Sequence, residues 1–93
     1  MKEEILKALS ELNIYFEHTF EGHPTSTANY SNEYDNDLFY FSIELREKVQ
    51  YISDVDYPDF LDLDLISFEL TNLNGEEIDA NLTEEEILNA INY

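Results

Sequence analysis

The spacing of apolar residues predicts a helix at the beginning of the chain and a strand directly after it. Over residues 2–12, apolar side chains recur every three or four positions, which gathers them on one face of a helix. From Ile14 onward the apolar positions alternate with polar ones, a period typical of a half-buried strand. This strand is predicted to span residues 14–21 and to end at Gly22 and Pro24.

The middle of the chain is predicted to contain a long loop and two paired strands. Residues 22–36 are polar and are predicted to form the loop. Residues 37–45 alternate most clearly, so they are predicted to form a strand whose odd-numbered residues from Phe39 to Leu45 face the core. The charged residues 46–48 are predicted to be a tight connection, and residues 49–55 to be the partner strand.

The last part of the chain is predicted to contain a fourth strand and a second helix. An acidic turn around Pro58 precedes the strand, which is predicted to span about residues 63–70. Thr83 and Glu86 have the spacing of a capping box, in which each residue satisfies a backbone N–H at the start of a helix. The apolar residues that follow recur at helical spacing, so a helix is predicted to begin after Thr83.

The predicted order of elements is helix, four strands, helix. Short connections between strands favour antiparallel pairing, and two amphipathic helices must bury their apolar stripes against another layer. The expected fold is therefore a two-layer α+β domain, with a four-stranded antiparallel sheet and both terminal helices on one of its faces. With 93 residues, the whole chain is expected to form this single acidic domain.

The charge excludes several classes of function. The chain has 22 Asp and Glu against four Lys and Arg, a formal net charge of -18. Such a chain is not expected to bind a nucleic-acid backbone or an anionic membrane, because both attract clustered basic residues. It has no apolar run long enough for a transmembrane helix and no recognisable secretory signal. It has no cysteine, which rules out disulfides and thiolate chemistry and favours a cytoplasmic location.

No catalytic motif is visible, and the protein is not expected to be an enzyme or to carry a cofactor. The two histidines, His18 and His23, are interpreted as packing or surface residues. The acids between Asp54 and Asp64 suggest calcium binding, but this segment lacks the glycine and the final glutamate of an EF-hand loop. A solvated acidic turn is the favoured interpretation, with an irregular divalent-cation site as the alternative, and no metal is predicted.

The acids are unevenly distributed along the chain. Residues 1–48 carry all four bases and a net charge of -6, whereas residues 49–93 carry no base and a net charge of -12. Carboxylates two residues apart on an extended strand lie about 6.5 to 7 Å apart on one face, so rows of them could imitate a nucleic-acid backbone. The predicted partner-binding, DNA-mimicking residues are Asp54, Asp56, Asp59, Asp62, Asp64, Glu76, Glu77, Asp79, Glu84 and Glu85.

In size, acidity, lack of cysteine and helix-sheet-helix order, the chain resembles the small acidic DNA-mimic proteins of phages and mobile elements. The segments that carry the likeness are DVDYPDFLDLD and NGEEIDANLTEEEI. Among these proteins, the chain is most similar to the Arn anti-restriction proteins of T-even phages. The resemblance implies inhibition of a host DNA-binding or restriction protein, such as the McrBC nuclease or the nucleoid protein H-NS. It also implies a dimer whose joined acidic surface imitates bent duplex DNA.

Two other classes of function remain open at this point. One is a target-specific inhibitor, such as a nuclease immunity or anti-CRISPR protein, which would bind through a few hot-spot residues. The other is a small structural protein whose acidity only keeps it soluble. In each case the expected partner is a protein rather than a nucleic acid or a membrane. A homodimer is also expected, because exposed tyrosines accompany a core near the lower size limit.

Overall fold

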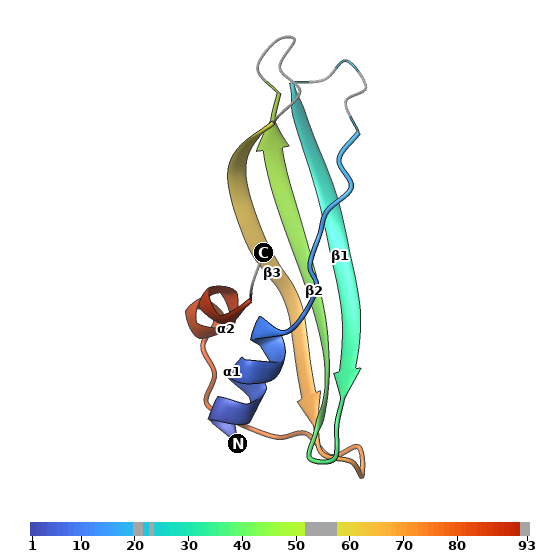
Figure 1. Cartoon of the computed structure of the whole chain (residues 1–93), viewed down its shortest axis with the longest axis vertical. Coiled ribbons are helices and arrows are strands. Elements are labelled where there is room, and N and C mark those ends of the chain that lie inside the picture. Colours follow the sequence, from blue (N-terminus) through green and yellow to red (C-terminus); the bar gives the residue numbers. More distant parts are fainter. Residues whose placement is uncertain (20–21, 23, 52–57, 92–93) are drawn as a thin grey trace.

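The computed structural model describes residues 1–19, 22, 24–51 and 58–91. Over these residues the fold is a small α+β arrangement of two helices and one antiparallel sheet with the strand order β1-β2-β3 (Figure 1). The α+β class is therefore confirmed, whereas the expected four-stranded sheet is wrong. The elements are α1 (Lys2–Ser10), β1 (Thr25–Asp35), β2 (Tyr40–Gln50), β3 (Asp59–Thr71) and α2 (Glu84–Ala90).

The strand predicted for residues 14–21 is not present in its described part, residues 14–19. These residues run as an extended segment without joining the sheet. Burial alternates along them, with Ile14 buried, Tyr15 exposed and Phe16 half-buried. The alternation of apolar and polar residues in this segment therefore arises because every second side chain faces an apolar surface. Alternating burial does not by itself require a hydrogen-bonded strand partner.

Residues 22–36, predicted to be a loop, contain β1 instead. Its inward-facing positions include Ala28, Tyr30 and Tyr34, and none of them is fully buried because β1 lies at the edge of the sheet. An edge strand with mostly Ser, Thr and Asn at its other positions has too weak an apolar alternation to be recognised. The Thr and Tyr residues, which favour strands, were the available signal.

β2 contains most of the strand predicted for residues 37–45, the predicted connection at 46–48, and the first two residues of the strand predicted for 49–55. The charged run was mistaken for a turn, although the alternation continues through it. The turn is earlier: the Asn36 backbone N–H donates to the carbonyl of Phe39 at 3.0 Å, and the Asn36 side-chain oxygen accepts from the backbone N–H groups of Leu38 and Phe39. Residues 52–55 lie outside the described residues.

β3 is longer than the strand predicted for residues 63–70, because it also includes the acidic stretch that begins at Asp59. Its pairing with β2 shifts register twice, between Glu44 and Leu45 and between Lys48 and Val49. Each shift marks a bulge that leaves a β3 residue without a partner opposite it. The acids of this stretch are thus fixed on a twisted strand rather than in a turn.

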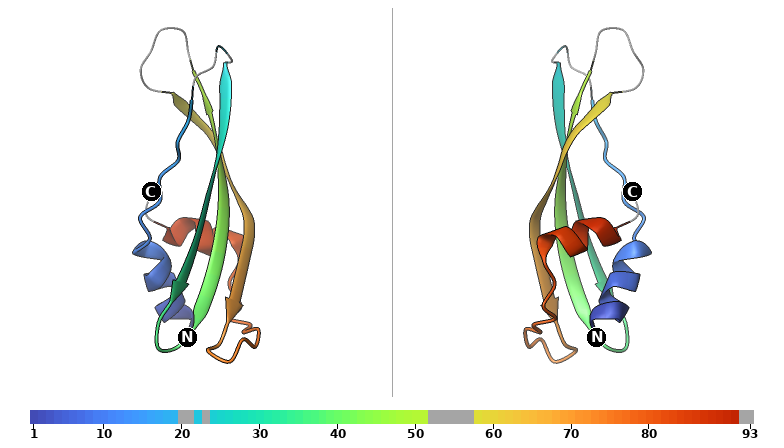
Figure 2. Two further views of the ribbon diagram at one scale, coloured as in Figure 1. Left: turned by 90° about the vertical axis from the view of Figure 1, so that its right-hand side faces the viewer. Right: turned by 90° about the vertical axis from the view of Figure 1, so that its left-hand side faces the viewer.

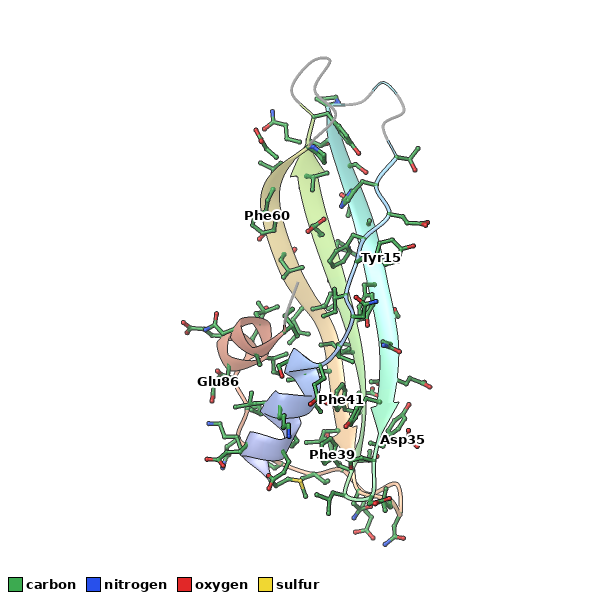
Figure 3. All side chains as sticks on the ribbon, viewed as in Figure 1. Tyr15, Asp35, Phe39, Phe41, Phe60 and Glu86 are labelled. Atoms are coloured by element: carbon green, nitrogen blue, oxygen red, sulfur yellow. The ribbon has the colours of Figure 1, made fainter. Side chains whose placement is uncertain are left out.

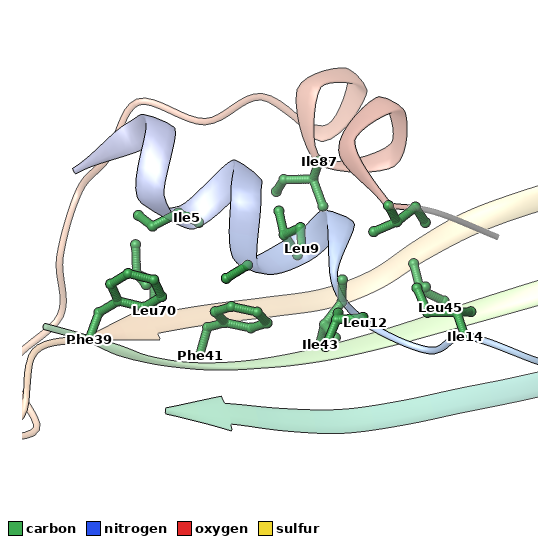
Figure 4. Close-up of a cluster of buried hydrophobic side chains, with 12 residues drawn as sticks. Ile5, Leu9, Leu12, Ile14, Phe39, Phe41, Ile43, Leu45, Leu70 and Ile87 are labelled. Atoms are coloured by element: carbon green, nitrogen blue, oxygen red, sulfur yellow. The ribbon is translucent and has the colours of Figure 1, made fainter. Parts of the chain in front are cut away.

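Both helices pack on the same face of the sheet, which we call the inner face (Figure 2). Figure 4 shows Ile5 and Leu9 of α1 and Ile87 of α2 above Phe41 and Ile43 of β2. As predicted, the odd-numbered residues from Phe39 to Leu45 are buried. The capping box at Thr83 and Glu86 is also confirmed, since each side chain bonds the backbone N–H of the other residue.

The molecule is an elongated rod with extents of 49 × 19 × 17 Å. The strands run along the rod, and the helices cover only the half of the sheet next to the turn at residues 36–39 (Figure 1). None of the helices in the described residues has the length and apolarity needed to cross a membrane. The opposite face of the sheet carries no helix in the described residues.

Candidate functional site

The residues that the strand register places on the uncovered face of the sheet, which we call the outer face, are polar. Side chains alternate across a strand, so the residues that flank the buried positions of β2 must point away from the helices. The register places their neighbours on β1 and β3 on the same side. The outer face consists of Thr25, Thr27, Asn29, Ser31, Glu33, Asp35, Tyr40, Ser42, Glu44, Arg46, Lys48, Gln50, Asp59, Asp62, Asp64, Ser67, Glu69 and Thr71.

The half of the outer face farther from the 36–39 turn carries charges of both signs. Arg46 lies opposite Asp64, and Lys48 lies opposite Asp62 on the neighbouring strand. The Arg46 Nε also donates to the side-chain oxygen of Asn29 at 3.2 Å. These two cations reduce the negative potential around the acids of β3. β3, which belongs to the base-free half of the sequence, therefore pairs with the part of β2 that carries the only two basic residues of the outer face.

The other half of the outer face carries negative charge only. Glu33 and Glu69 flank Ser42 from the two neighbouring strands, with Asp35 and Glu44 in the adjoining rows. At a strand spacing of about 4.8 Å, the backbones of Glu33 and Glu69 lie roughly 10 Å apart. We call Glu33, Asp35, Glu44 and Glu69 the acidic patch.

The acidic patch includes neighbours of Tyr40, and two of its members, Glu33 and Glu44, line a shallow hollow. Hydrogen bonding to Glu33 raises the pKa of Tyr40 above its usual value, and the negative charges of Glu33, Glu69 and Asp35 act in the same direction. The hollow has a volume of about 570 Å³ and is lined by small serine side chains between carboxylates. A Lys or Arg side chain from a partner would find the carboxylates of Glu33 and Glu44 there and little steric obstruction.

The predicted partner-binding residues do not form one cluster. Asp59, Asp62 and Asp64 lie along the outer face of β3, whereas Asp54 and Asp56 lie outside the described residues. The loop after β3, at the opposite end of the sheet, exposes Glu76, Glu77 and Asp79. The start of α2, in the helix layer, exposes Glu84 and Glu85.

The acidic patch is the part of this surface that sequence reasoning missed. Glu33 and Asp35 were placed in a loop, and Glu69 was not linked to them because it is distant in sequence. The signal that was available is the alternation of residues 40–50, which directs Glu44 and Tyr40 outward.

The chemistry of the outer face is that of solvated carboxylates. No charged residue among the described ones is fully buried. Within residues 1–19, 22, 24–51 and 58–91, no three His, Asp or Glu side chains are grouped closely enough to hold a metal ion. These carboxylates therefore suit ionic contacts with a basic protein better than proton transfer, which needs carboxyl groups in distinct, partly desolvated environments.

A second hollow, of about 710 Å³, lies on the inner face beyond the helices and is lined in part by His18 and Glu47, which contact each other. The His18 Nε2 lies 2.8 Å from a Glu47 oxygen, and its Nδ1 lies 3.0 Å from the Ser26 hydroxyl. Both imidazole nitrogens are thus used to hold the extended segment 14–19 against β1 and β2. This accords with the interpretation of His18 as a packing residue, whereas His23 lies outside the described residues.

No family model matches this chain, and no curated protein or solved structure matches it either. Its function is therefore argued from its own geometry and charge. The features that bear on function are the extended shape of the molecule and the carboxylates on the outer face, in the 76–79 loop and in the helix layer.

Proposed function

We propose that this protein is a DNA mimic, which inhibits a basic DNA-binding protein by occupying the cleft that receives duplex DNA. The observation that carries the proposal is the combination of rod shape and charge. Eighteen excess negative charges along 49 Å amount to one per about 2.7 Å. Duplex DNA carries one per about 1.7 Å of its axis. The rod therefore has more than half the linear charge density of the duplex.

The positions of the carboxylates support the same proposal. A duplex presents phosphates on every side, so a mimic must not confine its charge to one face. Here acids occupy the outer face, the loop after β3 and the first turn of α2. Figure 3 shows Asp35 at the margin formed by β1 and Glu86 beside α2 at the opposite margin. A cleft that encloses the rod would meet negative charge from several directions.

The expected target is a host DNA-binding or restriction protein, such as McrBC or the nucleoid protein H-NS, met in the host cytoplasm during infection. Attraction between the rod and a basic cleft is long-ranged and speeds encounter, and salt weakens it. The role is therefore inhibition by competition, without catalysis.

The decisive experiment is capture followed by displacement. The immobilised protein is incubated with host lysate at low salt, and captured proteins are then eluted with duplex DNA or with high salt. The proposal expects basic DNA-binding proteins, released by both treatments. When this chain is added to a complex of a purified captured protein with labelled duplex DNA, it should displace the duplex. The displaced fraction should fall as the salt concentration rises. Capture of no DNA-binding protein, or capture that duplex DNA cannot reverse, would contradict the proposal.

A target-specific inhibitor is the second candidate, and one observation favours it. Leu38 and Leu73 are 52% and 61% exposed at the same end of the sheet, next to the acidic 76–79 loop. Exposed leucines bordered by acids suit a single apolar socket with a basic rim. Replacing both leucines with serine separates the two functions. A specific inhibitor would lose most of its affinity, whereas a DNA mimic would keep both its affinity and its salt dependence.

A further inference from the structure

The free edge of β1 presents a regular row of backbone donors and acceptors. The Tyr51 N–H donates to the Pro24 carbonyl at 2.7 Å, and the Asn36 N–H donates to the Phe39 carbonyl at 3.0 Å. Both pairs continue the unbroken β1–β2 register and involve an even-numbered residue of the β1 side. Because hydrogen-bonded pairs alternate in an antiparallel ladder, the even residues of β1 bond to β2. The N–H and C=O groups of its odd residues therefore point away from the sheet.

The other edge of the sheet is protected, and β1 is not. β3 is bulged twice and carries several acids along its length, both of which discourage edge pairing. Its end is also covered, because the Ile78 N–H donates to the Leu70 carbonyl and Thr71 bridges to Glu77. β1 pairs with β2 over eleven residues without a bulge and contains neither proline nor lysine. No other strand in the described part of the chain adjoins it.

The charge along β1 favours a second copy of this chain over a basic partner at this edge. In a chain with a net charge of -18, residues 25–32 contain no Asp, Glu, Lys, Arg or His. A basic partner would gain little from an uncharged strand, whereas a second copy of this chain would be repelled almost everywhere else. The acids of β1 lie at one end, at Glu33 and Asp35. Antiparallel self-pairing would place the two sets at opposite ends of the shared ladder.

We propose that two copies of this chain associate through β1, edge to edge and antiparallel, to form one continuous six-stranded sheet. The two-fold axis runs perpendicular to the sheet, midway between the two β1 strands at their centre, so the odd residues of one copy pair with odd residues of the other. Thr27, Asn29 and Ser31 then form cross-strand polar pairs at the centre. Figure 1 shows both helices toward the β3 side, away from this edge.

Amide hydrogen exchange of the unmodified protein tests this arrangement residue by residue. In a monomer, the even residues Ala28 and Tyr30 are protected by β2, and the odd residues Thr27, Asn29 and Ser31 exchange freely. Raising the protein concentration should slow exchange of those odd amides on the order of tenfold or more, with little change at the even ones. A dimer whose odd amides stay unprotected, or a protein that remains monomeric at millimolar concentration, would overturn the proposal.

A proline variant tests the same edge independently. Thr27→Pro removes an N–H that faces away from β2, so it should leave the β1–β2 ladder intact while blocking the new one. We expect this variant to sediment at 11.0 kDa, whereas the matched Thr27→Ala protein sediments near twice that mass. Circular dichroism and protection of Ala28 verify that the variant is folded. Dimerisation of folded Thr27→Pro would contradict self-pairing through β1. The result does not depend on DNA mimicry, since neither substitution changes the charge.

Discussion

Neutralising part of the acidic patch provides the sharpest test of how this protein recognises a basic partner. The triple variant Glu33→Gln, Glu44→Gln and Glu69→Gln removes two exposed charges and the half-buried charge of Glu44, and leaves the side-chain shapes nearly unchanged. Each surface charge contributes on the order of 0.2 to 1 kcal/mol to such an interaction. The expected loss is therefore about 0.6 to 3 kcal/mol, which weakens affinity by roughly 3- to 150-fold.

The matched control removes the same number of charges from the other half of the outer face, as Asp59→Asn, Asp62→Asn and Asp64→Asn. Lys48 and Arg46 lie opposite two of these acids, so the local potential is already reduced and the expected loss of affinity is smaller. Both variants should unfold at the same urea concentration as the parent or a slightly higher one, because they relieve repulsion.

Affinity is measured by competition with labelled duplex DNA on the captured target, at several salt concentrations. The patch variant should give a flatter dependence of affinity on salt than the control, because fewer ionic contacts remain to be screened. If the patch variant is folded and competes as well as the parent at every salt concentration, recognition through the acidic patch is refuted. If the control variant loses more affinity than the patch variant, the β3 row is the main contact instead.

Three further changes test the fold that positions this surface. Phe41→Ala empties a fully buried site between Tyr34 and Phe68 and should cost about 3 to 5 kcal/mol of unfolding free energy in urea titration; a loss under 1 kcal/mol would contradict the core described here. Thr83→Ala removes the helix cap and should cost about 0.5 to 2 kcal/mol, whereas Thr83→Ser should cost little. Hydrogen bonding to Lys2 lowers the pKa of Glu86 below 4.5, so this contact stabilises the fold above that pH and is lost as pH falls through the lower folded-state pKa. Lys2→Met should flatten this part of the stability–pH curve, and an unchanged curve would contradict the contact.

The sequence was informative wherever a buried apolar face was strong. The inward residues of β2 and the stripe of α1 were predicted because large side chains recur at the period of their element. β1 was missed because an edge strand buries little, so Ser, Thr and Asn can occupy most of its positions. Residues 46–48 were misassigned because they form a charged run in the middle of a strand. Such a run needs its outward side chains in solvent and a partner for the inward one, and here Glu47 contacts His18. Such a partner cannot be inferred from local sequence.

The candidate surface was less predictable than the fold, since it depends on register between distant strands. That Asp62 and Asp64 point outward follows from alternation, but their placement opposite Lys48 and Arg46 does not. Equally, Glu33 and Glu69 come together only because β1 and β3 pair with β2 on its two sides. The two registers place these residues on either side of Ser42. Charge counted along the chain therefore identified the acidic half of the sequence, whereas the most uniformly negative part of the outer face combines acids from all three strands.

The rod shape explains how so repulsive a chain can fold around a small core. Two charges interact less strongly as their separation grows, so a sheet of long strands costs less in repulsion than a compact globule with the same charges. The helices are confined to one half of the inner face, where Phe39, Phe41 and Ile43 provide apolar area. Beyond that half, the strands continue with little additional core and carry charge outward on β3. If this argument holds, salt should raise the unfolding free energy of the protein while it lowers its affinity for a basic partner. A fall in both with salt would mean that attractive pairs such as Lys2 and Glu86 dominate the folded state.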